Sequence, residues 1–317
     1  MGLLPKDADI LPPSDDRIFK LLLTAPEAEP ALTDLISALI GRRVTHVAVR
    51  NNELPAQDTQ EKAERMDLNC QTDDGTQADV EMQARRMEED RERDAVTRHL
   101  NLKGRCVYYL CDLHSSQSSK GVMRYDRLAQ TYQVTFCSYT VFPEKTSYLN
   151  SFSLRHDQDN SLLCDAVHIV FVELSKLRTI LRKPVEDMTD LEKWALFLRY
   201  ADQARYREKL NSVIASKEAL QMAGEMLMSI SQDERERARL RSRRMYETDY
   251  LSNIATAEDR GRREGRREGE RKGRREGEHD MRVEFAKIML LHGHPIEQII
   301  EYTGLSRKEI EALFLKS

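Results

Sequence analysis

The segment 66–83 constrains this chain most, because it contains two runs of alternating polar and apolar residues joined by a turn with Gly75. Side chains of a β-strand point alternately to its two faces, so each run predicts a strand with one polar face. The polar residues are Asp67, Asn69 and Gln71 in the first run and Asp79, Glu81 and Gln83 in the second. We therefore predict a β-hairpin with one acidic face, and we interpret it as a metal-binding hairpin.

The length of the turn decides whether the two polar faces coincide, since a shift of one residue moves a strand's side chains to the opposite face. A two-residue turn would place Asp67 opposite Met82. A three-residue turn over 73–75 places Asp67 opposite Glu81, with Gly75 in the left-handed conformation. We predict the three-residue turn.

Helical and strand patterns alternate around this hairpin, which predicts an α/β fold. The first helix begins at Ser14 or Asp15, a second covers 30–40 and ends at Gly41, and a third resumes at about residue 95. The other predicted strands are 44–49, 132–142, 148–154 and 166–174, the last of which closes the sheet.

The chain becomes helical from about residue 189, and glycine then recurs at every fourth position from Gly261 to Gly277. Each glycine inside a helix costs about 1 kcal/mol relative to alanine, so this repeat is expected to be a frayed helix or a linker. Between 260 and 277, nine Lys and Arg residues stand beside four Glu. The repeat could bind phosphates or could be a solvated linker.

The last segment, 281–317, predicts a helix-turn-helix-like hairpin, with a capping box from Ser306 to Glu309.

Charge and cysteine content narrow the possible functions. Between 58 and 94, thirteen acidic residues stand beside six basic ones, and such a site needs a cation before it can accept a polyanion. The five cysteines form no C-x-x-C pair, which argues against a disulfide framework or a zinc cluster. No window approaches eighteen uninterrupted apolar residues, so we expect no membrane span and a cytoplasmic protein.

Several motifs occur in a fixed order along essentially the whole chain. They are Asp-Arg-Ile-Phe-Lys at 16–20, Asp67 followed by Glu81, Met82 and Gln83, Arg105 with Tyr108 and Tyr109, Gln117 with Lys120 and Gly121, the helix containing Trp194, and the glycine repeat. Together they resemble the recombination-promoting nuclease and transposase family of the PD-(D/E)xK nuclease superfamily.

This resemblance implies a restriction-endonuclease-like core, with a mixed sheet flanked by helices, followed by a helical C-terminal half. We place the core at 1–180, a helical region at 181–258, the glycine-rich linker or helix at 259–280 and the terminal hairpin at 281–317. Asp67 and Glu81 correspond to the metal-binding acids and Asp16 to an amino-terminal acidic position. Gln83 stands where other branches of the superfamily carry lysine, as is expected for this branch, and Met66 replaces the proline that often precedes the first acid.

The predicted chemistry is hydrolysis of DNA phosphodiester bonds with Mg²⁺ or Mn²⁺, in recombination or transposition. Asp67, Glu81 and the backbone carbonyl of Met82 would hold the metal, and Gln83 would orient the attacking water. The alternative for these side chains is that they are ordinary solvent-facing strand residues. Asp79 could support the metal ligands, but an exposed strand carboxylate is the favoured interpretation.

Contacts with DNA are expected from Lys20 and from the tail, although Lys20 could equally be a helix residue whose charge reaches the solvent. The tail arginines are Arg262, Arg263, Arg266 and Arg267. The alternative function is a non-catalytic, mobile-element-derived protein that binds DNA or forms an oligomeric scaffold, with the C-terminal half as the contact between copies.

Overall fold

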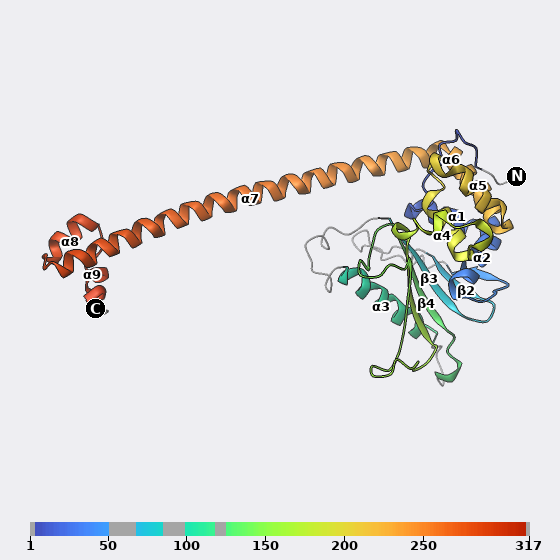
Figure 1. Ribbon diagram of the computed structural model, residues 1–317, viewed down its shortest axis with the longest axis horizontal. Coiled ribbons are helices and arrows are strands. Elements are labelled where there is room, and N and C mark those ends of the chain that lie inside the picture. Colours follow the sequence, from blue (N-terminus) through green and yellow to red (C-terminus); the bar gives the residue numbers. More distant parts are fainter. Residues whose placement is uncertain (1–3, 51–67, 85–98, 118–124, 315–317) are drawn as a thin grey trace, which may run out of the picture. The chain divides into compact units, whose positions relative to one another are not determined.

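The fold is described from a computed structural model, over residues 4–50, 68–84, 99–117 and 125–314 (Figure 1). The chain divides into two compact units, 1–238 and 239–317, each described by itself.

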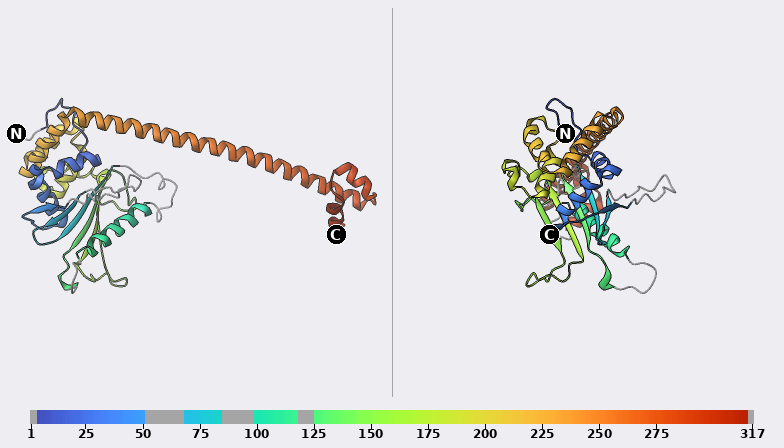
Figure 2. Two further views of the ribbon diagram at one scale, coloured as in Figure 1. Left: turned by 180° about the vertical axis from the view of Figure 1, so that it is seen from behind. Right: turned by 90° about the vertical axis from the view of Figure 1, so that its right-hand side faces the viewer.

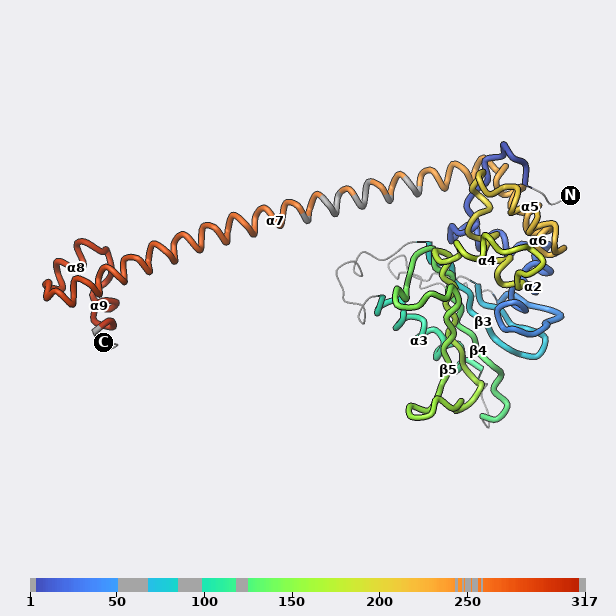
Figure 3. Tube along the Cα trace, viewed as in Figure 1, coloured from blue at the N-terminus to red at the C-terminus, as the bar shows by residue number. Residues whose placement is uncertain are grey.

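The first unit contains a six-stranded sheet, counted over the described residues. Its strands are β1 (Val47–Val49), β2 (Asn69–Thr72), β3 (Gln77–Gln83), β4 (Thr131–Cys137), β5 (Leu149–Ser153) and β6 (Val167–Glu173). Their order is β1-β2-β3-β4-β6-β5; β3, β4 and β6 are parallel, and the other pairs are antiparallel. The predicted α/β fold with a mixed sheet is confirmed. The prediction that the last strand closes the sheet was wrong, because β6 lies between β4 and β5, and β5 forms the edge. Figure 3 follows the Cα trace through β3, β4 and β5.

Helices cover both faces of this sheet (Figure 1, Figure 2). Two neighbouring residues of β4 contact different helix layers, one on each face of the sheet, because side chains of a strand alternate between faces. The ring of Phe136 lies 5.9 Å from that of Phe19 on α1 (Asp16–Thr24). The hydroxyl of Thr135 lies 3.4 Å from the sulfur of Cys106 on α3 (Leu100–Ser115). The α3 layer therefore covers the face that carries Thr135.

The α1 layer continues into a helical bundle. It contains α2 (Glu29–Ile40), α4 (Asp190–Tyr200), α5 (Arg207–Ala215) and α6 (Glu218–Gln232). Short 3-10 turns cover Pro26–Ala28, Tyr125–Arg127, Leu174–Lys176, Ile180–Arg182, Val185–Asp187 and Ala204–Tyr206. Trp194 of α4 is fully buried and donates from Nε1 to Oδ2 of Asp34 on α2 over 2.8 Å, which fastens these two helices together.

The ends of these helices follow from their local sequence. Asp15 accepts hydrogen bonds from two backbone amides at the start of α1, Gly41 ends α2 with a φ of 74°, and Thr189 opens α4 with a capping box. The helix starts and the glycine stop predicted for the first two helices are confirmed.

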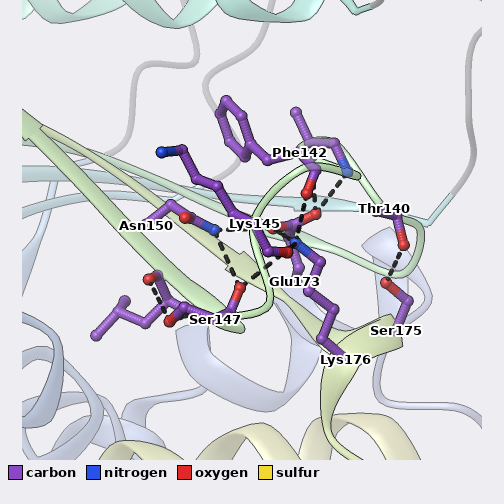
Figure 4. A network of polar contacts seen from close by, with 10 residues as sticks. Thr140, Phe142, Lys145, Ser147, Asn150, Glu173, Ser175 and Lys176 are labelled. Atoms are coloured by element: carbon purple, nitrogen blue, oxygen red, sulfur yellow. Dashed lines mark hydrogen bonds and ion pairs between the residues drawn. The ribbon is translucent and has the colours of Figure 1, made fainter. Parts of the chain in front are cut away.

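Buried Glu173, at the carboxyl end of β6, organises the chain that follows β4 (Figure 4). Its carboxylate accepts hydrogen bonds from the backbone amides of Val141 and Phe142 over 2.6 and 3.1 Å, and from Asn150 Nδ2 over 2.8 Å. Lys176 Nζ donates to the same carboxylate over 2.6 Å. A buried carboxylate with so many donors is a structural anchor, which holds the β4–β5 connection at this end of the sheet.

In the second unit, α8 (Ile296–Thr303) and α9 (Arg307–Phe314) pack against the last turns of α7 (Glu234–Leu291). The core consists of Ala286, Met289, Ile299, Leu305 and Ile310. The predicted hairpin is present: Gly304 turns the chain with a φ of 67°, and Glu309 accepts from the backbone amide of Ser306 over 2.7 Å.

The glycine repeat lies within α7, and a Cβ added at any of its five glycines would meet no neighbouring atom within 4 Å. Ion pairs between successive turns, such as Arg266 with Glu270 at 2.8 Å and Arg274 with Glu278 at 3.0 Å, support this helix. Among the described helices, none combines the length and the apolar content that crossing a bilayer requires.

Candidate active site

The hairpin formed by β2 and β3 has the predicted register. Asn69 lies opposite Asp79, and the carbonyl of Leu68 accepts from the amide of Val80 over 2.9 Å. The turn is three residues long, and Gly75 has a φ of 87°, so the predicted turn is confirmed. Asp67 lies outside the described residues. The observed register is nevertheless the one that an Asp67–Glu81 pair requires.

Asp74 stabilises this turn. One of its carboxylate oxygens accepts from the amide of Thr76 over 3.1 Å and from the hydroxyl of Thr72, and Arg42 forms an ion pair with the other. The hydrogen bond from Arg42 is the main reason that the pKa of Asp74 lies below its usual range, and the bonds from Thr72 and Thr76 lower it further. Asp74 therefore prefers its charged form, and its contacts stabilise the observed turn.

The polar face of the hairpin is buried. Asp79 is fully buried and Glu81 is 3% exposed, because β4 lies beside β3 and α3 covers this face. In the parallel pair, Asp79 lies beside Gln133 and Glu81 beside Thr135. The alternative that Asp79 and Glu81 face the solvent was wrong.

Glu81 is the centre of the candidate site. Arg105 of α3 donates from Nη2 to Oε2 of Glu81 over 3.0 Å, and the amide nitrogen of Gln83 lies 3.4 Å from the same oxygen. Burial raises the pKa of Glu81; Arg105 and Gln83 act in the opposite direction, and the negative charge of Asp16 raises it further. Gln83 thus contacts Glu81 directly, whereas Asp16 acts on Glu81 through its charge.

Arg105 was absent from the predicted site. The sequence held a signal for it, because Leu102, Cys106 and Tyr109 define the buried stripe of α3, and Arg105 borders that stripe. A basic residue at the border of a helix that covers an acidic strand is a candidate partner for that strand's carboxylates.

The remaining predicted residues lie as follows. Met82 follows Glu81, so its buried side chain points to the opposite face of the sheet. Lys20 is half-buried on α1, one helical turn after Asp16. In the second unit, Arg262 and Arg266 of α7 form ion pairs with Asp259 and Glu270 on the same helix, and Arg263 and Arg267 lie on that helix as well.

The donor chemistry fits a hard divalent cation. Mg²⁺ and Mn²⁺ prefer carboxylate and carbonyl oxygens, and Glu81 offers a buried carboxylate. Burial raises its pKa more than Arg105 lowers it. Within the described part of the chain, no group of three or more His, Cys, Asp or Glu residues could hold a metal ion. Asp67, the other predicted metal ligand, lies outside the described residues.

Comparison with known proteins agrees with this geometry. The sequence model of one family, described as PD-(D/E)XK nuclease family transposase, matches residues 13–257, which include α1, the whole sheet and α3 to α6. Searches of curated proteins and of solved structures each found no match. Since the match covers most of the chain and includes Asp16, Glu81 and Gln83, the chain belongs to the PD-(D/E)XK nuclease family transposases.

Proposed function

We propose that this protein is a metal-dependent DNA endonuclease that acts in recombination or transposition. The observation that carries the proposal is the buried carboxylate of Glu81, which Arg105 and Gln83 contact at the end of β3. A family known for nucleases and an acidic site built around one such carboxylate support hydrolysis at this position.

In this proposal Asp67, Glu81 and the backbone carbonyl of Met82 hold Mg²⁺, or Mn²⁺ in its place. A divalent cation bound there would lower the pKa of a coordinated water and stabilise negative charge on the phosphate. The observed hairpin register supports the pairing, because Asn69, two residues after Asp67, lies opposite Asp79, two residues before Glu81.

The other polar residues orient the reaction. Gln83 lies on the same face as Glu81 and donates a neutral hydrogen bond, which suits the positioning of a water molecule. The negative charge of Asp16 raises the pKa of Glu81, and in this proposal the Asp16 carboxylate accepts a hydrogen bond from the attacking water. We assign both residues a role in orienting the nucleophile.

DNA contacts outside the site are proposed for Lys20 and for the basic repeat of α7, with Arg262, Arg263, Arg266 and Arg267 among the contributing residues. Contacts with phosphates give affinity that is independent of sequence and depends on salt. Five cysteines without a disulfide suit a reducing compartment such as the cytoplasm.

The test is cleavage of supercoiled plasmid DNA by the full chain with Mg²⁺ and with EDTA. We expect nicking with Mg²⁺, and its loss with EDTA and in the double variant Asp67→Ala, Glu81→Ala. Equal nicking by the wild type and the double variant would contradict this site. If the wild type binds DNA but neither cleaves it nor binds a metal ion, the alternative function, a non-catalytic DNA-binding protein, is favoured.

A further inference from the structure

Arg105 is more than a packing residue of α3. Its one hydrogen bond among the described residues goes to Glu81, while its Nε is buried and has no hydrogen-bond partner. The side chain is 26% exposed, compared with 3% for Glu81, so the guanidinium lies between the buried carboxylate and the surface. A guanidinium has five N–H donors, and the hydrogen bond to Glu81 uses one of them, on Nη2.

Among the described basic residues, Arg105 is the one whose charge lowers the pKa of Glu81. Gln83, two residues after Glu81, is neutral, so it cannot stabilise the charge that builds up on a phosphate as a lysine would. Lys103, also on α3, points its ammonium over the ring of Phe142 at 4.9 Å. Arg17, on α1, is bound to Glu236 through two hydrogen bonds. Arg105 is the described basic residue that contacts Glu81.

We propose that Arg105 is a catalytic residue, which binds a non-bridging oxygen of the phosphate being cleaved and supplies the positive charge that Gln83 cannot. The proposal rests on the proposed nuclease function. Arg105 would share Glu81 with the bound cation and turn its remaining donors toward the DNA. A guanidinium suits this contact, because it is always charged and its N–H groups form strong charge-assisted hydrogen bonds with phosphate oxygens.

The chemistry balances without any further reactant. The oxygen of a water molecule forms a bond to phosphorus while the bond from phosphorus to the leaving sugar oxygen breaks. One proton of that water ends on the sugar hydroxyl, and the other remains on the new phosphate monoester until it ionises. Arg105 keeps its proton throughout and acts through its charge, because a guanidinium does not deprotonate in proteins.

A structural role for Arg105 makes different predictions. If the guanidinium only held Glu81 in place or fastened α3 to β3, a new cation on a different residue could not replace it. If it supplies charge to the phosphate, a lysine at position 83 should replace it in part, because Gln83 lies on the same face and beside the same carboxylate oxygen.

The experiment compares full-length wild type with Arg105→Ala, Arg105→Lys, Gln83→Lys and the double variant Arg105→Ala, Gln83→Lys in Mg²⁺-dependent plasmid cleavage. We expect Arg105→Ala to lower kcat about 10²–10³-fold, as removal of one charge-stabilising donor does in other enzymes. The kcat of Arg105→Lys should lie between those of Arg105→Ala and the wild type. The kcat of the double variant should be at least about tenfold higher than that of Arg105→Ala. Lys103→Ala, which removes a cation from the same helix, is the matched control and should cleave like the wild type.

A second readout separates charge supply from support of Glu81. Mn²⁺ affinity measured by calorimetry should be at least as high in Arg105→Ala as in the wild type, because a competing cation has left the carboxylate. Loss of Mn²⁺ binding in this variant would overturn the proposal, as would cleavage within threefold of the wild type or absence of rescue by lysine.

A third readout applies if the wild type cleaves nothing, which would refute the proposed function. Binding of fluorescent duplex DNA is then compared in Ca²⁺, another cation that prefers oxygen ligands. Loss of one charge-assisted hydrogen bond should weaken binding by Arg105→Ala about tenfold. Equal affinities of Arg105→Ala and the wild type would overturn the phosphate contact itself.

Discussion

Asn69 of β2 lies directly opposite Asp79 of β3, and this register depends on a three-residue turn in which Gly75 has a φ of 87°. Gly75→Ala places a Cβ in the left-handed region, so we expect the free energy of unfolding to fall by about 1–2 kcal/mol. A shift of register would also separate the two acidic positions, so Mn²⁺ affinity should fall. Urea unfolding and calorimetry measure the two effects.

The control for Gly75→Ala is Gly41→Ala. Gly41 ends α2 with a similar φ of 74°, and a Cβ there meets no neighbouring atom. Both variants should lose stability, but Gly41→Ala should keep the metal affinity of the wild type. If both variants keep the metal affinity of the wild type, the hairpin register does not depend on glycine at position 75, and the prediction is contradicted.

A second prediction concerns Asp74 and pH. Because Arg42 lowers the folded-state pKa of Asp74, its charge stabilises the fold above the unfolded-state pKa, and this contribution disappears as the pH falls toward the folded-state value. Asp74→Asn should lower the free energy of unfolding at pH 7 by up to about 1 kcal/mol, a small effect because solvent screens a side chain that is 45% exposed. The difference from the wild type should shrink as the pH falls below about 4.

Urea unfolding at pH 7, 5 and 3 measures this dependence on pH. Asp157→Asn is the control, because Asp157 is exposed and its carboxylate has no hydrogen bond to another described residue. A difference between Asp74→Asn and the wild type that stays constant from pH 7 to pH 3 would exclude the Arg42–Asp74 charge pair as its source.

A third prediction separates two sets of basic residues on α7. Arg262, Arg266, Lys272 and Arg274 form ion pairs with acidic residues of the same helix. Arg263, Arg267, Arg271 and Arg275 recur every fourth residue, and none of the ion pairs of the described chain includes them. Replacing these four by Gln should weaken DNA binding and reduce the slope of log K against log salt by about 3–4, if each contacts one phosphate.

The matched variant replaces the four ion-paired residues by Gln and removes the same charge from the same helix. It should weaken DNA binding less, because those cations are already neutralised by their partners. Equal losses in the two variants would indicate that only the net charge of α7 matters, and no loss in either would leave the tail without a role in DNA binding.

A fourth prediction tests whether α3 covers the polar face of the sheet. Cys70, Cys106 and Cys137 are buried, and burial raises the pKa of Cys106 to about 11, whereas Cys111 and Cys164 are exposed. Ellman's reagent at pH 7.5 should therefore modify two thiols quickly and three only after unfolding. Cys111→Ser should remove one fast thiol, and rapid modification of Cys106 would show that α3 does not stay in place.

The turn and the helix ends could be predicted from sequence because they depend on neighbouring residues. Gly75 fixes the turn, Asp15 caps α1 and Gly41 ends α2. The burial of Asp79 could not be predicted, since an alternating pattern shows that a strand has a polar face but not which element covers it.

The contact between Arg105 and Glu81 joins residues 24 positions apart and exists only once α3 packs on the sheet. The position of β6 between β4 and β5 likewise depends on strand order, which periodicity does not encode. The hairpin is therefore the part of the site that could be predicted from sequence. The contribution of α3, the contact of Arg105 with Glu81, could not be predicted.

The most direct test of the account is the position of a metal ion. Crystals of the full chain grown with Mn²⁺ should show one anomalous peak in the site, within direct coordination distance of carboxylate oxygens from both Asp67 and Glu81, roughly 2.0–2.6 Å for hard divalent cations. We expect this shared peak in the wild type and its loss in Glu81→Gln. A Mn²⁺ ion bound elsewhere, or Asp67 and Glu81 too far apart to share one ion, would contradict it.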